Sequence, residues 1–112
     1  VMFERSRTGA VDVLRGQDPI NLPNVRHLAE QLDSCLSSGQ PHVVLDLEKV
    51  PLIDSAGLEL LLDFQDRCAE RSGVMKLSAP TPLCREILVV TGVATRFDIY
   101  QDSLAAIGSF AQ

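Results

Sequence analysis

Short apolar runs, bounded by glycine, proline and polar turn residues, predict five β-strands along the chain. The predicted strands cover residues 2–6, 10–15, 42–47, 74–78 and 97–100. The run at 42–47 is nearly continuous in its hydrophobicity, which is typical of a strand buried on both faces. Thr8-Gly9 indicates a turn between the first two strands, which therefore form a hairpin.

Apolar residues that repeat at intervals of three and four predict four helices between and after these strands. Their expected limits are Pro23 and Gly39 for the first, Ser55 and Arg71 (with Gly73 as cap) for the second, Thr81 and Gly92 for the third, and Asp102 or Ser103 at the start of the last. The residues expected to face inward are Val25, Leu28, Leu32, Cys35, Leu36, Leu58, Leu61, Leu62, Cys68, Ala69, Leu83, Ile87, Leu88, Leu104, Ile107 and Phe110.

The order of these elements predicts an α/β fold. After the opening hairpin, strands and helices alternate, and such alternation implies right-handed crossovers and a largely parallel sheet. The hairpin adds an antiparallel pair, so we expect a single-layer, mixed sheet of about four to five strands with about four helices packed against it. The length of 112 residues suits one domain covering 1–112.

Composition narrows the classes of function. The chain is 46% hydrophobic but only 4% aromatic, without Trp, so its core must be aliphatic. The net charge of -5 and the lack of a basic run argue against a nucleic-acid partner, because phosphate contacts need clustered Lys and Arg. No signal peptide or membrane-spanning run is visible, so we expect a cytoplasmic protein without direct membrane insertion.

The sequence offers little for catalysis. Cys35, Cys68 and Cys84 match no metal or redox spacing, and we expect them to be small buried hydrophobes in a reducing compartment. His27 and His42 lie near no candidate nucleophile in the sequence. Phosphate-binding glycine loops and Cys-x-x-Cys pairs are absent. The sequence therefore predicts no cofactor, no metal and no enzymatic activity.

Asp54-Ser55-Ala56-Gly57 follows the most hydrophobic strand and opens a long predicted helix. Asp54 can cap this helix, which places Ser55 at its first position with the hydroxyl at the surface. Ala56 and Gly57 are small, and glycine in a first turn suggests close packing or close approach, since it lowers helix stability. An ordinary helix cap and a functional surface both remain open from these residues.

A phosphate on Ser55 would change this surface strongly. It would add about -1.5 to -2 charges, and the N–H groups and dipole of a helix N-terminus tolerate such charge. Asp54 and Glu59 already make the surface acidic. A partner would therefore meet new charge and bulk, while the domain itself stays folded.

The chain resembles STAS domains, the fold of anti-sigma-factor antagonists and sulfate-transporter tails. The similar residues are the strand Val43–Leu47, the loop and helix start Val50–Leu58, Thr91-Gly92-Val93, the strand Phe97–Tyr100, and Gly16 at the end of the second strand. The resemblance implies phosphorylation of Ser55 and a partner-binding surface made of Asp54, Ser55, Ala56, Gly57, Leu58 and Glu59. It also implies a monomer without cofactor whose partners are an anti-sigma-factor serine kinase of the histidine-kinase-like ATPase fold and a phosphatase.

In this implied mechanism, the unphosphorylated chain binds the kinase and displaces a sigma factor, and phosphorylation of Ser55 releases the chain. Two positions depart from the antagonist pattern: Ala56, where Ser or Thr is frequent, and Glu59, where a small residue is frequent. The run Asp54–Leu58, followed by Leu60-Leu61-Leu62, is also similar to STAS subunits of phospholipid-trafficking ABC transporters. A stressosome-like scaffold domain is a further alternative.

Overall fold

The computed structural model of the protein describes residues 3–36 and 39–111. Its elements are β1 (Phe3–Thr8), β2 (Val11–Gly16), α1 (Val25–Ser34), β3 (His42–Asp46), α2 (Ser55–Glu70), β4 (Val74–Ser78), α3 (Pro82–Val90), the 3₁₀-helix η1 (Val93–Arg96), β5 (Ile99–Tyr100) and α4 (Ser103–Ser109). The predicted order of strands and α-helices is confirmed, and β4 has the predicted limits. Met2, the first residue of the first predicted strand, lies outside the described residues.

The strands form one five-stranded sheet in the order β1-β2-β3-β4-β5. The β1–β2 pair is antiparallel, and the three pairs that follow are parallel. The predicted fold class, a mixed and largely parallel single sheet, is therefore confirmed. The hairpin turn lies at Gly9 and Ala10, one residue later than predicted, and Gly9 has a φ of +60°, which glycine adopts without strain.

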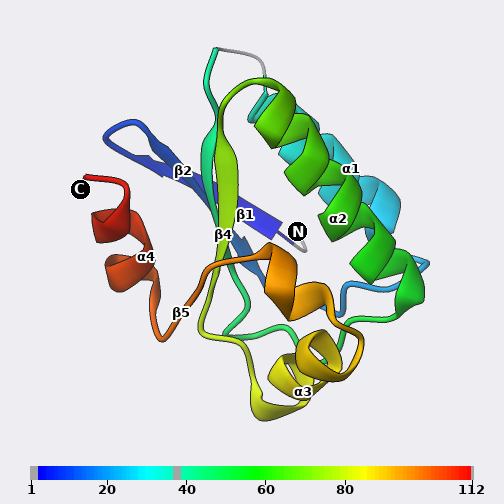
Figure 1. Ribbon diagram of the computed structural model, residues 1–112. Helices are drawn as coiled ribbons and strands as arrows, with labels where there is room; N and C mark the ends of the chain where they lie inside the picture. The colour runs from blue at the N-terminus through cyan, green and yellow to red at the C-terminus, as the bar shows by residue number, and fades with distance from the viewer. Residues whose placement is uncertain (1–2, 37–38, 112) are drawn as a thin grey trace.

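The helices cover the sheet unequally. α1 and α2 lie side by side on one face, with α3 below them, and α4 lies on the opposite face (Figure 1). The larger core includes Phe3, Leu45 and Phe64 on the α1–α2 side. The smaller core beneath α4 holds Val11, Val13, Val44 and Ala106. Residues of β3 contribute to both cores, as its continuous hydrophobicity predicted.

Three residues predicted to face inward are exposed. Ala69 of α2 is at the surface, Leu83 of α3 is 50% exposed and Leu104 of α4 is 81% exposed. The inner faces of α3 and α4 are instead set by Cys84 with Leu88 and by Ala106. α3 and α4 have nine and seven residues, too few for spacing alone to fix which side packs on the sheet.

Polar contacts hold α4 against its face of the sheet. Ser103 donates to Asp46 Oδ2 at 2.9 Å, and its hydroxyl also lies 2.9 Å from that of Ser78. The buried Lys76 donates to Ser109 at 2.7 Å, and its Nζ lies 4.2 Å from the centroid of the Phe110 ring. α4 is thus fixed at both ends by hydrogen bonds around a small apolar core.

Candidate functional site

The N-terminus of α2 is built around Asp54, which caps the helix as predicted. Asp54 has extended backbone geometry, and its Oδ1 accepts a hydrogen bond of 2.9 Å from the N–H of Gly57. Its Oδ2 accepts a second bond of 2.9 Å, from the N–H of Leu22. The same side chain therefore starts the helix and ties it to the segment that leads into α1.

The backbone reinforces this connection. The Asp54 N–H donates to the Ile20 carbonyl at 3.1 Å, and the Ile20 N–H donates to the Leu52 carbonyl at 3.0 Å. These bonds form a short parallel bridge between Ile20 and Ile53, apart from the main sheet. The loop before Ser55 is held at Leu52 and at Asp54, so the position of the helix start does not depend on α2 alone.

Hydrogen bonds from the N–H groups of Gly57 and Leu22 lower the pKa of Asp54 below its ordinary value of 3.8. Because the folded pKa is the lower one, the ionised carboxylate stabilises the fold above pH 3.8, and this contribution is lost as the pH falls through the folded value.

Replacing Asp54 with Asn is expected to lower the melting temperature by a few degrees at neutral pH. The amide keeps one oxygen acceptor, so one of the two N–H groups loses its partner. The difference from the unmodified chain should shrink in strong acid, where Asp54 is protonated. Thermal unfolding followed by circular dichroism between pH 7 and pH 2 measures this.

Asp102→Asn is the matched control, since the N-cap of α4 accepts a single N–H, from Ala105 at 2.8 Å, and Asn can replace it. A difference at Asp54 that stays constant with pH would show that its charge adds nothing.

Ser55 is the first residue of α2, and it is exposed. Ala56 is half-buried beside it, while Leu58 is half-buried and Glu59 exposed one turn along. Gly57 lies on the inner side of the helix. A Cβ placed there would lie 2.8 Å from Ile20 Cγ2 and 2.9 Å from Ile53 Cγ2. Close packing within the chain therefore accounts for this glycine, and the surface around Ser55 consists of Ala56, Leu58 and Glu59.

A groove of about 400 Å³ begins next to this surface. It runs between α1 and α2, and Ala56 and Glu59 line it together with Leu22, which is 70% exposed. The sequence analysis did not identify Leu22 as part of this surface. No local signal connects Leu22 with Asp54, which lies 32 positions away.

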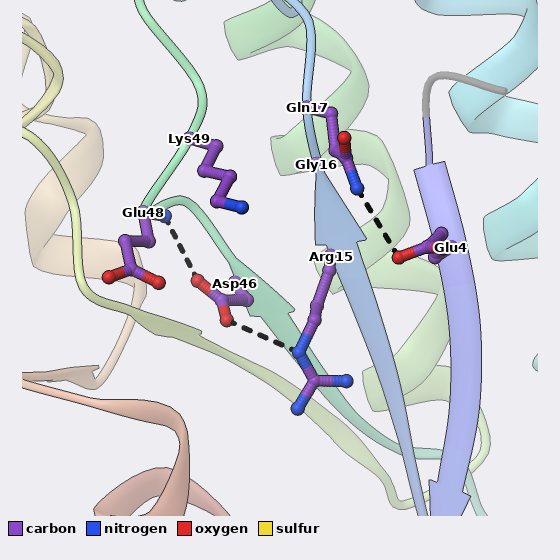
Figure 2. Close-up of a pocket in the computed structure, with 7 residues that line it drawn as sticks. All are labelled: Glu4, Arg15, Gly16, Gln17, Asp46, Glu48 and Lys49. Atoms are coloured by element: carbon purple, nitrogen blue, oxygen red, sulfur yellow. Dashed lines mark hydrogen bonds and ion pairs between the residues drawn. The ribbon is translucent and has the colours of Figure 1, made fainter.

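A second, polar pocket of about 210 Å³ lies at the carboxyl ends of β2 and β3. Figure 2 shows Arg15 and Asp46 pointing toward each other, with Arg15 Nε 3.7 Å from Asp46 Oδ2. Asp46 also accepts the N–H of Glu48 at 2.9 Å, and Gln17 donates to Glu4 at 3.3 Å. Two pairs of lining side chains, Arg15 with Asp46 and Gln17 with Glu4, thus tie together β1, β3 and the end of β2.

Other chemistry finds little support in the described part of the chain. No group of three or more His, Cys, Asp or Glu side chains there is placed to hold a metal ion. All three cysteines are buried, as predicted, and burial raises the pKa of Cys35 to about 11 and that of Cys68 to about 12. Such thiols stay protonated at neutral pH and are poor nucleophiles. No helix among the described residues is long and apolar enough to cross a membrane.

Comparison with known proteins gives a consistent result. A family model described as STAS domain matches residues 3–106. A protein of Bordetella bronchiseptica, provisionally named as the anti-sigma factor antagonist BtrV, is 29% identical over 94 residues, which cover 84% of this chain and 81% of that protein.

Two solved structures share the fold. One is described provisionally as an anti-sigma factor antagonist of Thermotoga maritima, with a TM-score of 0.92, 21% identity and coverage of 99% of this chain and 96% of that one. The other is the Bacillus cell fate determinant SpoIIAA in its phosphorylated form, with a TM-score of 0.73, 17% identity and coverage of 96% and 98%.

Proposed function

The chain belongs to the STAS domain family, and from this premise we propose that it is a cytoplasmic anti-sigma-factor antagonist switched by phosphorylation of Ser55. It acts by binding another protein and has no catalytic activity of its own. Its partner is an anti-sigma factor that is also an ATP-dependent serine kinase. Binding of the unphosphorylated chain releases a sigma factor, and a phosphatase restores the chain after phosphorylation.

The exposed hydroxyl of Ser55 at the first position of α2 is the observation that carries this proposal. A kinase can reach it without unfolding the domain, and the helix N-terminus tolerates the added negative charge. Asp54 keeps the helix start fixed through Gly57 and Leu22, so the phosphate alters the surface and leaves the backbone in place. The similarity to BtrV and the phosphorylated state of SpoIIAA support the same conclusion.

The partner-binding surface is proposed to centre on Ser55, with Ala56, Leu58 and Glu59 exposed or half-buried around it. Asp54 and Gly57 contribute by fixing the shape of this surface. The monomeric chain presents this surface to one partner at a time. New negative charge at its centre would repel acidic groups of the partner and leave polar groups unpaired on binding.

Incubation of the purified chain with ATP and a lysate of its source cells is expected to add one phosphate, located on Ser55 by peptide mass spectrometry. Ser55→Ala should remain unmodified under the same conditions, and Ser72→Ala controls for an exposed serine at the other end of α2. Phosphate on another residue, or none at all, would overturn the proposed switch. Recovery of an ABC-transporter ATPase with the unmodified chain would favour a transporter subunit.

A further inference from the structure

The groove between α1 and α2 has the build of a docking site for a helix. Its floor is apolar, with half-buried Val25 and Ala29 from α1 and half-buried Leu60 from α2. It has a volume of about 400 Å³ and opens beside Ala56, the residue after Ser55. A segment lying in this groove would therefore contact the proposed phosphorylation site at one end.

The charges on the rim of the groove differ from those farther along the two helices. Farther along, Asp33 of α1 forms an ion pair with Arg67 of α2. Arg67 is therefore engaged with Asp33 and not with Asp63, which lies four residues before it on α2. In the described part of the chain, Arg26, Glu59 and Asp63 make no ion pair or side-chain hydrogen bond. These three charges are free to meet a partner.

Resting on the proposed function, we propose that this groove holds an amphipathic helix of the anti-sigma factor. The apolar stripe of that helix covers the floor. Glu59 and Asp63 are four residues apart on α2, so their side chains are spaced by roughly 6 Å. They face two Lys or Arg residues, also one turn apart, on one side of the bound helix. Arg26, on the α1 side, faces an acidic residue on its other side.

Photo-crosslinking tests where the partner lies. A benzophenone amino acid replaces Arg26 on the groove rim, Leu52 in the loop before Ser55, or Leu104 in α4 on the opposite face of the sheet. All three positions are exposed. Each variant is irradiated in the cell lysate, and the crosslinked peptide is sequenced. The variants at 26 and 52 are expected to label one kinase, and the peptide attached at 26 should carry an apolar stripe with two basic residues four apart. The variant at 104 should not label it.

Labelling at 52 without labelling at 26 would be consistent with the proposed function, but it would contradict the proposal that the groove binds a helix of the partner. A peptide at 26 without the apolar stripe and basic pair would overturn it equally. Absence of labelling at all three positions would defeat the proposed function together with the inference.

Charge reversal with the purified kinase gives an independent measure. Glu59→Lys combined with Asp63→Lys is expected to weaken binding at least about tenfold, since two favourable pairs become repulsive. Glu70→Lys, an exposed site on the same helix outside the groove, should leave the affinity unchanged. Reversing the two basic residues of the kinase to Glu should restore binding to the double variant. Unchanged affinity of the double variant, while phosphorylation of Ser55 still abolishes binding, would refute the groove alone.

Discussion

Replacing Gly57 with Ala is expected to destabilise the protein by about 3 kcal/mol, although alanine is ordinarily the better helix former. The new methyl group would press on the carbonyl oxygen of Ile20 and on the side chains of Ile20 and Ile53. The carbonyl cannot move freely, because it accepts the N–H of Asp54. Relief would require the bridge between Ile20 and Ile53 to separate from α2, which would also strain the bond from Leu22 to Asp54.

Urea unfolding of the unmodified chain, Gly57→Ala and Gly108→Ala measures this effect. Gly108 lies in α4, and a Cβ there would meet no atom within 4 Å. Gly108→Ala should therefore keep or raise stability, by up to about 1 kcal/mol. Equal stability of the two variants would mean that the segment at Ile20 does not pack tightly on the start of α2.

The start of α2 could be predicted from the sequence because its signals are local. Asp54 and Ser55 come after a hydrophobic strand, and both Asp and Ser are preferred where a helix begins. The cap of α3 was equally accessible, and Thr81 accepts the N–H of Cys84 at 3.2 Å. In both cases the capping side chain and the group it bonds lie three residues apart, so no knowledge of the fold is needed.

Contacts between distant parts of the chain could not be predicted. Gln65 is polar but buried, and its amide donates to the carbonyls of Met75 and Arg96 and accepts the Met75 N–H. β5 is only two residues long, so the backbone N–H and carbonyl of Met75 in β4 bond to the Gln65 side chain and not to a neighbouring strand. Nothing near Gln65 in the sequence indicates this. The packing that requires glycine at position 57 could not be predicted either, because Ile20 is distant in the sequence and contacts Gly57 only in the folded chain.

For α4, the pattern of apolar residues predicts that a helix forms but not which of its residues face the sheet. Spacing predicted a helix there, and Asp102 caps it. The face of the sheet that α4 covers depends on Ser103 meeting Asp46 and on Lys76 meeting Ser109, pairs separated by 57 and 33 residues. Leu104 was assigned to the interior on hydrophobicity, while the polar contacts turn Ala106 inward.

Replacing Ser55 with Asp is expected to weaken binding of the anti-sigma factor by about a hundredfold, the size of effect found when a charge is left without a partner in an interface. The domain itself should keep its stability, because Ser55 is exposed and an acidic residue at the first position of a helix interacts favourably with the helix dipole. Ser55→Ala should bind as the unphosphorylated chain does and should no longer be released by ATP. Isothermal titration calorimetry with the purified kinase, with and without ATP, measures all of these affinities.

Ser72→Asp separates the position of the charge from its mere presence. Ser72 is exposed just beyond the other end of α2. The variant has the same net charge as Ser55→Asp, because both replace a serine with an aspartate. Only the substitution at 55 should reduce binding. Equal losses for both would point to a general electrostatic effect of an acidic chain on its partner, and intact binding of Ser55→Asp would show that charge at the helix start does not control the partner. A loss confined to Ser55→Asp, in a domain of unchanged melting temperature, is the result that a switch acting through the surface requires.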